Sequence, residues 1–385
     1  MLSKNINLKS FGLKKKNNPK IKKDLRLLLT EKNIVIKSLT PFYRNSFTKN
    51  NISKLKKSNN FRVIGMGGSI LGIEAIYSFL KKKIKKNFYF DNNLKPSHKK
   101  NNYKNCTNVI ISKSGNTLET ISNVNLIIKK NYKNVFITEN KNNYLLNLAK
   151  ILKSQIIHHN NFIGGRYSVL SEVGMLPAEL MGLDIKKFKQ INNLIKDKNF
   201  VNLLTKNVSH TLYFLKQKKF NSIILNYDDQ SKNLFNWYQQ LIAESLGKKG
   251  KGILPIISTM PKDNHSLMQL YLDGPRNNFF TFFYVDENKT SKIINNKILP
   301  SHNYLRNKNF GQIMYSQKIA TENVFLKKGI PFRSFDVSIR NEKTLGELFC
   351  FFILETILIG RALKINPYDQ PAVELIKNET KKILI

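Results

Sequence analysis

The chain has 385 residues, and 65 Lys and Arg against 25 Asp and Glu give it a formal charge of +40. Its hydrophobic content of 41% is enough for a buried core, and 18 glycines with 11 prolines exclude a collagen-like or Pro/Gly low-complexity chain. Two cysteines, Cys106 and Cys350, exclude a disulfide framework and favour a reducing compartment. The charge alone leaves open either a nucleic-acid partner or a compositional bias toward Lys and Asn.

The N-terminus and one apolar run are the two segments that bear on location. Residues 1–23 are basic and lack an apolar core of signal-peptide length, which argues against secretion and for a cytoplasmic protein. A transit peptide is a less favoured alternative, because Lys and Asn dominate instead of Arg. Residues 345–363 form the longest apolar run, but Glu347, Glu355 and Arg361 interrupt it. We therefore predict a buried helix there and no membrane span.

Strands and helices alternate along most of the chain. Residues 1–60 show weak periodicity, with one short helix indicated at 25–29. The pattern then predicts strands at 61–66, 108–112 and 134–138, helices at 70–80 and 118–129, and a Lys- and Asn-rich loop at 92–105. Such alternation is typical of a parallel sheet with helical crossovers.

The same alternation returns in the second half. It predicts strands at 222–226, 253–258, 280–285 and 330–337, helices at 234–246, 266–272, 312–327 and 344–363, and a polar loop at 286–309. The predicted fold class is therefore α/β, with two units at 51–204 and 205–365. A basic N-terminal segment (1–50) precedes them and a C-terminal tail (366–385) follows.

Two turns that suit anions follow neighbouring predicted strands. Residues 65–72, GMGGSILG, let backbone N–H groups approach an anion, but the spacing fits neither a dinucleotide fingerprint nor a P-loop, and a plain tight turn is equally compatible. Residues 112–117 contain three hydroxyls and Lys113, which suit a phosphate monoester; an ordinary helix start capped by Asn116 or Thr117 is the alternative. Because both turns face one crevice at the carboxyl edge of the sheet, sugar-phosphate binding is favoured.

Four ionisable residues stand out further along the chain. Glu244 lies seven residues after Trp237, so it faces the apolar side of its helix, either as a general base or as a carboxylate paired with Lys or Arg. Arg166 follows two glycines, His265 sits at a predicted helix start, and Lys377 lies near the C-terminus. For each of these three, spacing alone does not separate a catalytic role from a structural or solvated one.

Taken together in this order, these segments resemble the glucose-6-phosphate isomerase (phosphoglucose isomerase) family. The matching stretches are residues 65–72, 112–120, 164–168, 237–248, 263–275 and 366–377, so the resemblance runs from about residue 61 to 377. It implies two sugar-isomerase (SIS) domains, each a mainly parallel sheet flanked by helices. This agrees with the α/β prediction made from the residues.

The resemblance also implies an activity, the reversible isomerisation of glucose 6-phosphate and fructose 6-phosphate through a cis-enediol, in glycolysis and gluconeogenesis. Glu244 resembles the base that moves a proton between C2 and C1, and Arg166 resembles the arginine that stabilises the enediolate. His265 and Lys377 resemble the pair associated with ring opening. The positions that resemble phosphate and sugar contacts are Gly68, Ser69, Ser112, Lys113, Ser114, Thr117, Gln240 and Gln370.

A homodimer with shared active sites is implied as well, because the family's histidine comes from the partner subunit. No metal and no organic cofactor are implied. The chain departs from the family at three positions: Asn116 replaces a hydroxyl residue, Ala372 replaces a usual Gly, and Glu172 occupies a slot that is usually small or Pro. The acidic side chain of Glu172 raises the question of whether it perturbs Arg166.

Three alternatives remain to be weighed. A bifunctional phosphoglucose/phosphomannose isomerase would be separated by a substrate assay. A non-catalytic SIS-type phosphosugar sensor should lack Glu244, His265 and Lys377, and all three are present. A nucleic-acid binder needs a basic stripe interleaved with aromatics or a docking motif, and neither is found. The predicted partner is thus a small phosphosugar, with most of the charge on a solvated, Lys-rich surface.

Overall fold

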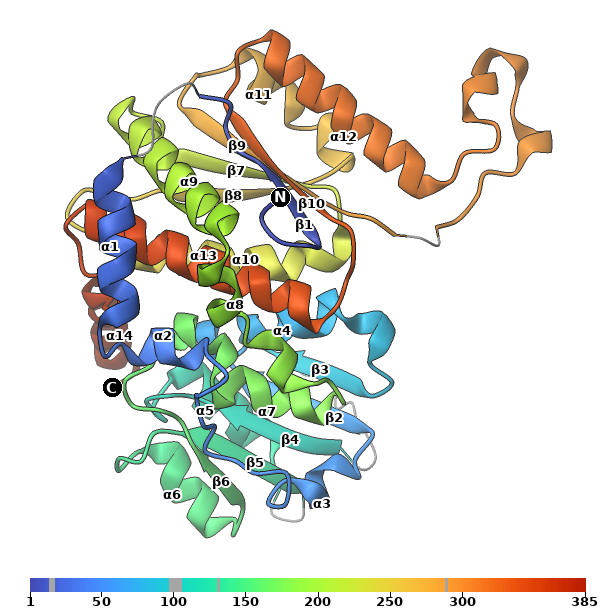
Figure 1. Ribbon diagram of the computed structural model, residues 1–385. Coiled ribbons are helices and arrows are strands. Elements are labelled where there is room, and N and C mark those ends of the chain that lie inside the picture. Colours follow the sequence, from blue (N-terminus) through green and yellow to red (C-terminus); the bar gives the residue numbers. More distant parts are fainter. Residues whose placement is uncertain (14–17, 97–105, 130–131, 288–289) are drawn as a thin grey trace.

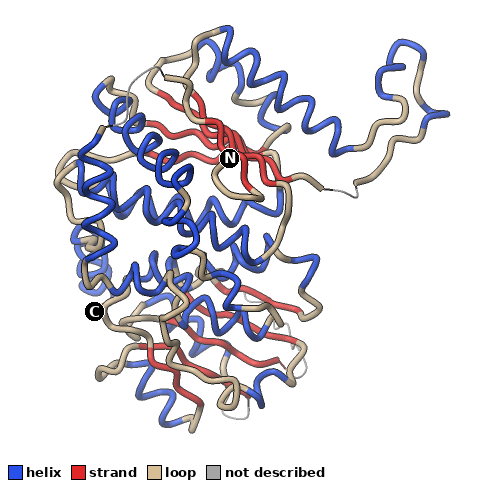
Figure 2. The backbone as a smooth tube through the Cα atoms, viewed as in Figure 1, coloured by secondary structure: helices blue, strands red, loops and turns tan. Residues whose placement is uncertain are grey.

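The computed structural model describes residues 1–13, 18–96, 106–129, 132–287 and 290–385, and it contains two β-sheets separated by helices (Figure 1). Figure 2 shows the strands of both sheets in red and the helices between and around them in blue. The predicted fold class, two mainly parallel sheets flanked by helices, is confirmed. The division between residues 204 and 205 stays a prediction.

The first sheet has five parallel strands in the order β3-β2-β4-β5-β6 within the described residues. Its strands are β2 (Asn60–Gly65), β3 (Asn87–Asp91), β4 (Cys106–Ile111), β5 (Lys133–Thr138) and β6 (Gln155–His158). The helices around it are α3 (Ser53–Lys56), α4 (Leu71–Phe79), α5 (Leu118–Ile127), α6 (Tyr144–Ile151) and α7 (Glu172–Leu180). Parallel order places all the strand ends that precede the predicted anion-binding turns at one edge.

The second sheet has the order β1-β10-β9-β7-β8 in the described part of the chain. Its parallel strands are β7 (Asn221–Asn226), β8 (Leu254–Thr259), β9 (Asn278–Val285) and β10 (Phe332–Val337). The N-terminal strand β1 (Ile6–Lys9) joins the edge antiparallel to β10, with Ile6 opposite Val337. Residues from the extreme N-terminus therefore complete a sheet whose other strands come from the second half.

A layer of helices packs between the two sheets (Figure 1). In this region α10 (Lys232–Leu246) contacts α4, and α13 (Glu342–Ala362) contacts α9 (Lys198–Lys216) and α10. One buried apolar cluster joins side chains of both sheets, among them Val63 and Ile111 of the first and Ile224 and Phe335 of the second. The remaining helices are α1 (Pro19–Thr30), α2 (Ile34–Ser38), α8 (Ile191–Lys196), α11 (Met268–Asp273), α12 (Phe310–Lys327) and α14 (Pro371–Leu384).

All seven predicted strands are present, each within a few residues of its expected bounds. The strands that were not predicted are β1, β3 and β6, and the pattern also missed α6, α7 and α9. The predicted loop at 92–105 lies largely outside the described residues. The predicted polar loop at 286–309 contains short 3-10 turns at Asn295–Lys297 and Pro300–Leu305, and it projects from the body as an arm beside α12 (Figure 1).

The long apolar run is the buried helix α13, as predicted. Its acidic residues are buried because each has a partner: Ser3 Oγ donates to Glu347 Oε2 at 2.6 Å, and Glu355 pairs with Arg333 of β10. Tyr238 also donates to Glu355, with its hydroxyl 3.2 Å from Oε2. In the parts of the chain that the structure describes, no helix is both long enough and apolar enough to cross a membrane.

We expect Glu355→Gln to destabilise the protein by about 3–5 kcal/mol, because it leaves the fully buried Arg333 guanidinium without its counter-charge. The measurement is the free energy of unfolding from urea titration. Glu31→Gln is the matched control, since it removes a more exposed Glu partner from Arg361 of the same helix, and about 0–1 kcal/mol is expected there. Equal effects of the two substitutions would contradict the argument.

Candidate active site

Two of the predicted anion-binding turns lie side by side at the carboxyl edge of the first sheet. The turn at 66–70 follows β2, the turn at 112–117 follows β4, and the two strands pair with Gly65 opposite Ile111. A Cβ atom added to Gly65 would lie 3.0 Å from the Ile111 carbonyl oxygen, so the backbones are close where the turns begin. The sequence-based expectation that both turns face one crevice is therefore consistent with this register.

A third loop crosses the glycine turn. The 3-10 segment Gly165–Leu170 packs on the 3-10 turn Gly67–Ser69. A Cβ atom on Gly68 would lie 2.1 Å from the carbonyl carbon of Gly165 and 2.3 Å from the backbone nitrogen of Arg166. No side chain fits in that gap, so Gly68 allows the two backbones to cross. The crossing fixes the position from which the Arg166 side chain starts.

Arg166 is a buried hub whose five N–H donors are all directed at acceptors. Its Nε donates to Ser245 Oγ at 2.9 Å, and Nη1 donates to Glu244 Oε2 at 3.1 Å and to Gln370 Oε1 at 2.7 Å. Nη2 donates to the carbonyl oxygens of Pro367 at 2.8 Å and Asp369 at 2.9 Å. Because a guanidinium has five N–H groups in a fixed fork, this set also fixes its orientation. Arg166 thus ties α10 to the segment between α13 and α14.

Glu244 extends from α10 beside this arginine. Its side chain is 30% exposed, whereas that of Arg166 is 1% exposed, so the carboxylate lies at the boundary between the core and solvent. Gln240, one helical turn earlier, donates from Nε2 to Glu244 Oε1 at 2.8 Å. The sequence left open a catalytic carboxylate or one paired with Lys or Arg, and the structure shows the pair. One geometry accommodates both roles, since Glu244 is paired and still reaches solvent.

Two of the hydroxyl groups in the turn at 112–117 are within hydrogen-bonding distance of each other. Ser112 Oγ and Thr117 Oγ1 are 2.9 Å apart, and Ser112 Oγ accepts from the Gly115 backbone N–H at 3.2 Å. Thr117 occupies the N-cap position of α5, yet its side chain makes no capping hydrogen bond to the helix. Ser114 Oγ accepts from the Asn116 backbone N–H at 3.3 Å. The amides at the start of α5 are therefore not capped by the residue that would ordinarily do so.

Lys113 in this turn is half-buried. Burial lowers the pKa of its ammonium group, and the neighbouring Glu139 carboxylate acts in the opposite direction. Asn116, which stands where the family usually has a hydroxyl residue, makes a structural contact. Its Oδ1 accepts from the Tyr144 backbone N–H at 3.0 Å, at the start of α6. An amide at this position therefore links two neighbouring loops.

Glu172 makes none of its hydrogen bonds to Arg166. Its Oε2 accepts from the Tyr43 hydroxyl at 2.8 Å, and its Oε1 accepts from the Asn160 backbone N–H at 2.6 Å. His159 Nδ1 lies 4.0 Å from the same Oε1, and burial lowers the pKa of this histidine. The carboxylate thus braces the turn that precedes Gly164. This answers the question that the sequence raised about this unusual acidic residue.

Two of the predicted catalytic residues lie apart from the pair in this single chain. His265 is exposed in the turn after β8, at the carboxyl edge of the second sheet. Lys377 is exposed on α14, and its ammonium pairs with Glu374 Oε1 at 2.6 Å. Among the described residues, neither makes a hydrogen bond or ion pair with Arg166 or Glu244. The structure therefore brings together Arg166, Glu244, Gln240 and Gln370, and the roles of His265 and Lys377 stay predictions.

Sequence reasoning missed several contributors to this site. Ser245 is fully buried and accepts from Arg166, and the Tyr167 hydroxyl lies 2.9 Å from its oxygen. Trp237 Nε1 donates to the Arg166 carbonyl oxygen at 3.2 Å, so a residue noted only as apolar also holds the backbone. The carbonyl oxygens of Pro367 and Asp369 carry no signal in the side-chain pattern. The proximity of Ser245 to Glu244 in the sequence was the one available hint.

Known proteins provide the next evidence. A family model described as phosphoglucose isomerase matches residues 6–259, which is more than half of the chain. The chain belongs to the phosphoglucose isomerase family. This confirms the resemblance that was drawn from the six sequence motifs.

Individual phosphoglucose isomerase relatives agree over most of the chain. A protein of Methanocaldococcus jannaschii named glucose-6-phosphate isomerase is 33% identical over 368 residues, covering 89% of this chain and 88% of the relative. One of the same name from Mycoplasmopsis pulmonis is 33% identical over 380 residues, covering 88% of each. A solved glucose-6-phosphate isomerase of Chlamydia trachomatis has the same fold, with a TM-score of 0.73 at 17% identity over 95% of this chain and 83% of that one.

We expect Gly68→Ala to destabilise this phosphoglucose isomerase family member by about 1–3 kcal/mol, because the new methyl group collides with the backbone of residues 165 and 166. The measurement is the free energy of unfolding from denaturant titration. Gly164→Ala is the matched control, since its Cβ would lie 3.9 Å from the Tyr167 ring and from the Tyr368 carbonyl oxygen, an ordinary van der Waals distance. Unchanged stability of Gly68→Ala would show that the two loops do not cross as closely as described.

Proposed function

We propose that the chain catalyses the reversible isomerisation of glucose 6-phosphate and fructose 6-phosphate through a cis-enediol. The observation that carries this is the contact between Arg166 and the partly exposed Glu244 beside two anion-suited turns, in a member of the phosphoglucose isomerase family. The chain is thus an aldose–ketose isomerase, whose place is in glycolysis and gluconeogenesis. The substrate assignment rests on relatives named glucose-6-phosphate isomerase at 33% identity.

The phosphate is bound, in this proposal, by the turn at 112–117. Ser112, Ser114 and Thr117 supply hydroxyls, Lys113 supplies an ammonium group, and the uncapped amides of α5 face an anion favourably. Gly68 and Ser69 on the neighbouring turn contribute further contacts. This arrangement orients the reacting end of an open-chain sugar toward Glu244.

The proton transfer itself is assigned to Glu244. Its carboxylate takes the proton from C2 of the aldose and returns it to C1, while a second proton passes from the O2 hydroxyl to O1, which leaves the ketose. The enediolate formed between the two steps carries the negative charge. Arg166 Nη1 lies 3.1 Å from the carboxylate, and four further acceptors hold the rest of the guanidinium, so Arg166 stabilises that charge from a preorganised position. Gln240 and Gln370 hold the same carboxylate and guanidinium, respectively. Each step moves a proton between side chain and sugar or within the sugar, so the proposal uses no organic cofactor.

Ring opening is assigned to His265 and Lys377, with the histidine supplied by a second copy of the chain. His265 is exposed and remote from Glu244 in the single chain, as a residue that serves the neighbouring subunit's site would be. Two apolar surfaces suit an interface with that copy. The arm carries Leu299 and Tyr304, each 70% exposed, and α14 carries a row of exposed aliphatic side chains, Leu375, Ile376, Ile383 and Leu384.

A cytoplasmic location completes the proposal. Both cysteines are free thiols, Cys350 fully buried and Cys106 partly exposed. Such thiols are typical of proteins from reducing compartments.

We expect Glu244→Gln to lower kcat for glucose 6-phosphate by about 10²–10⁴-fold, because an amide does not accept the C2 proton. Binding of the phosphosugar, measured by equilibrium dialysis, is expected to change only a few-fold. Glu179→Gln is the control, since it makes the same change at a glutamate that is paired with Lys56, away from the site. Near-normal turnover of Glu244→Gln would overturn the assignment of the base. In a separate assay of the unmodified protein, turnover of mannose 6-phosphate would extend the substrate range.

The shared site is tested by mixing inactive variants. Dimers that combine a Glu244→Gln chain with a His265→Ala chain contain one intact site, made of Glu244 from one subunit and His265 from the other. After denaturation and refolding together, random pairing should restore about a quarter of wild-type activity. In the control, Glu244→Gln is mixed with Arg166→Lys, and because these two residues act within one chain, no activity should return. Failure of the first mixture to regain activity would exclude a histidine supplied across the interface.

A further inference from the structure

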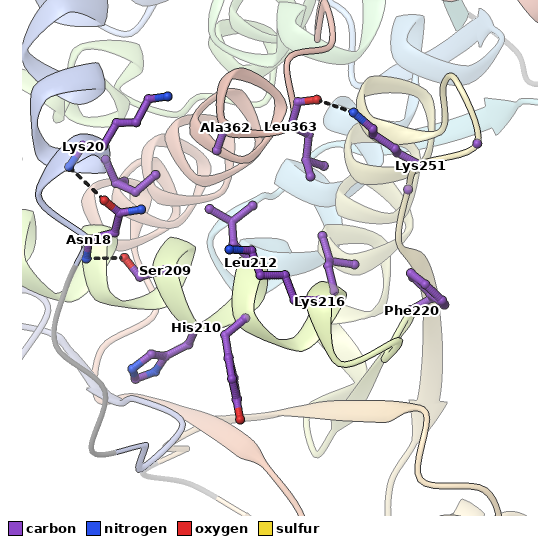
Figure 3. Close-up of a pocket in the computed structure, with 15 residues that line it drawn as sticks. Asn18, Lys20, Ser209, His210, Leu212, Lys216, Phe220, Lys251, Ala362 and Leu363 are labelled. Atoms are coloured by element: carbon purple, nitrogen blue, oxygen red, sulfur yellow. Dashed lines mark hydrogen bonds between the residues drawn. The ribbon is translucent and has the colours of Figure 1, made fainter.

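A cavity of about 500 Å³ lies away from the Arg166–Glu244 pair and shares no lining residue with it. It is bounded by α1, α9, the turn at 250–252 and the end of α13 (Figure 3). Its volume falls within the range of about 300–1,000 Å³ that is typical of small-molecule sites. No role has been assigned to this part of the molecule by the proposed reaction.

The cavity has an apolar floor. It is lined by Leu212 and Leu215 of α9, Ile21 of α1, and Ala362 and Leu363 at the end of α13. Phe220 stands at its edge and is 48% exposed, although a side chain of this size is ordinarily buried. A ligand with an apolar body would therefore remove a substantial apolar surface from water.

The polar lining is basic. Lys20, Lys216 and Lys251 come from three different elements and line the same cavity (Figure 3), and no Asp or Glu is among the described residues that line it. Within the described residues, none of these three lysines forms an ion pair with a carboxylate. Elsewhere, scarce acidic residues are paired with Lys or Arg, as at Arg333–Glu355 and Lys56–Glu179. Three ammonium groups without a carboxylate partner, beside an apolar floor, complement an apolar ligand with an anionic head group.

We propose that this cavity binds a small amphipathic anion, such as an aromatic or aliphatic carboxylate, and that its occupancy is transmitted to Arg166. The transmission runs through the segment between α13 and α14. Lys251 Nζ donates to the Leu363 carbonyl oxygen at 2.8 Å (Figure 3). Lys248 Nζ donates to the carbonyl oxygen of Asn366, three residues after Leu363, at 2.5 Å.

Lys248 also pairs with Asp369 Oδ1 at 2.8 Å, and Lys248 and Lys251 are joined by backbone hydrogen bonds in both directions. The same segment supplies the Pro367 and Asp369 carbonyl oxygens that bind Arg166 Nη2. An anion that draws the Lys251 ammonium group away from Leu363 thus breaks one of the hydrogen bonds that hold the segment that orients Arg166. We expect occupancy to weaken phosphosugar binding and to slow turnover, an effect that rests on the proposed function.

Binding is tested with 2-naphthoate on the full chain by equilibrium dialysis. We expect one saturable site per chain, with clearly weaker binding of 2-naphthol, which lacks the charge, and of acetate, which lacks the apolar body. Lys20→Ser combined with Lys216→Ser should weaken naphthoate binding about tenfold. Ala362→Trp, which fills the floor, should weaken it as well while leaving the lysines in place.

The matched control separates a built site from general attraction to a highly basic protein. Lys186→Ser combined with Lys187→Ser removes the same charge from exposed lysines outside the cavity, and should leave naphthoate affinity within about twofold. Equal weakening in both double variants, or equal affinity for naphthoate and naphthol, would overturn the proposed site. These measurements do not depend on catalysis, so they hold whether or not the isomerase assignment does.

Coupling is tested by reciprocity. Saturating fructose 6-phosphate should raise the naphthoate dissociation constant about fivefold, and saturating naphthoate should raise that of fructose 6-phosphate by the same factor. Both effects should disappear in Lys251→Ser, which lacks the ammonium group that carries the transmission to Leu363. Naphthoate affinity that is independent of fructose 6-phosphate would overturn the transmission to Arg166. Complete mutual exclusion that survives in the Lys20→Ser, Lys216→Ser chain would place naphthoate in the phosphosugar site and overturn the cavity as well.

Discussion

The buried guanidinium of Arg166 is the interaction on which the rest of the site depends. A charge that is removed from water is tolerated only when its hydrogen-bonding groups are satisfied, and here every N–H of the side chain has an acceptor. Those acceptors come from α10 and from residues 367–370, which lie far apart in the sequence. The arginine therefore forces two remote segments into one geometry, and the carboxylate of Glu244 is positioned by the same contacts that keep the charge buried.

The composition of the chain limits how many of its basic side chains can pair with a carboxylate. With 25 acidic residues against 65 basic ones, carboxylates are the scarcer partner for ion pairs. Glu355 holds Arg333, Glu172 braces the turn before Gly164, and Glu244 meets both Arg166 and solvent. The surplus of lysines lies mainly at the surface, so its effect on anionic molecules comes from the places where several of them surround one cavity.

The sequence pattern predicted all of the central strands, because buried strands between helices have a distinct local signature. It missed β3 and β6, which are short outer strands whose existence depends on the neighbours they pair with. It also missed β1, whose partner β10 lies at the other end of the chain. At the site, the glycines, Glu244 and Arg166 were found from their types and spacing together with the family resemblance. Their mutual contact was not, because 78 residues separate them and only the tertiary fold determines that they meet. The same holds for the carbonyl oxygens of Pro367 and Asp369, which no side-chain pattern reports.

The pairing of β1 with β10 has a consequence for the nascent chain. Ile6 leaves the ribosome 331 positions (337 − 6) before its partner Val337 is made. At about 5–20 residues per second, this strand waits roughly 15–65 s for the edge it completes. During that interval Leu2, Ile6 and Leu8, which are buried in the finished protein, have no strand to cover them. Lys4 and Lys9 interrupt this apolar stretch, and such charges oppose aggregation of an unpaired strand. The basic character of the N-terminus thus protects a segment that must remain unfolded until synthesis is nearly finished.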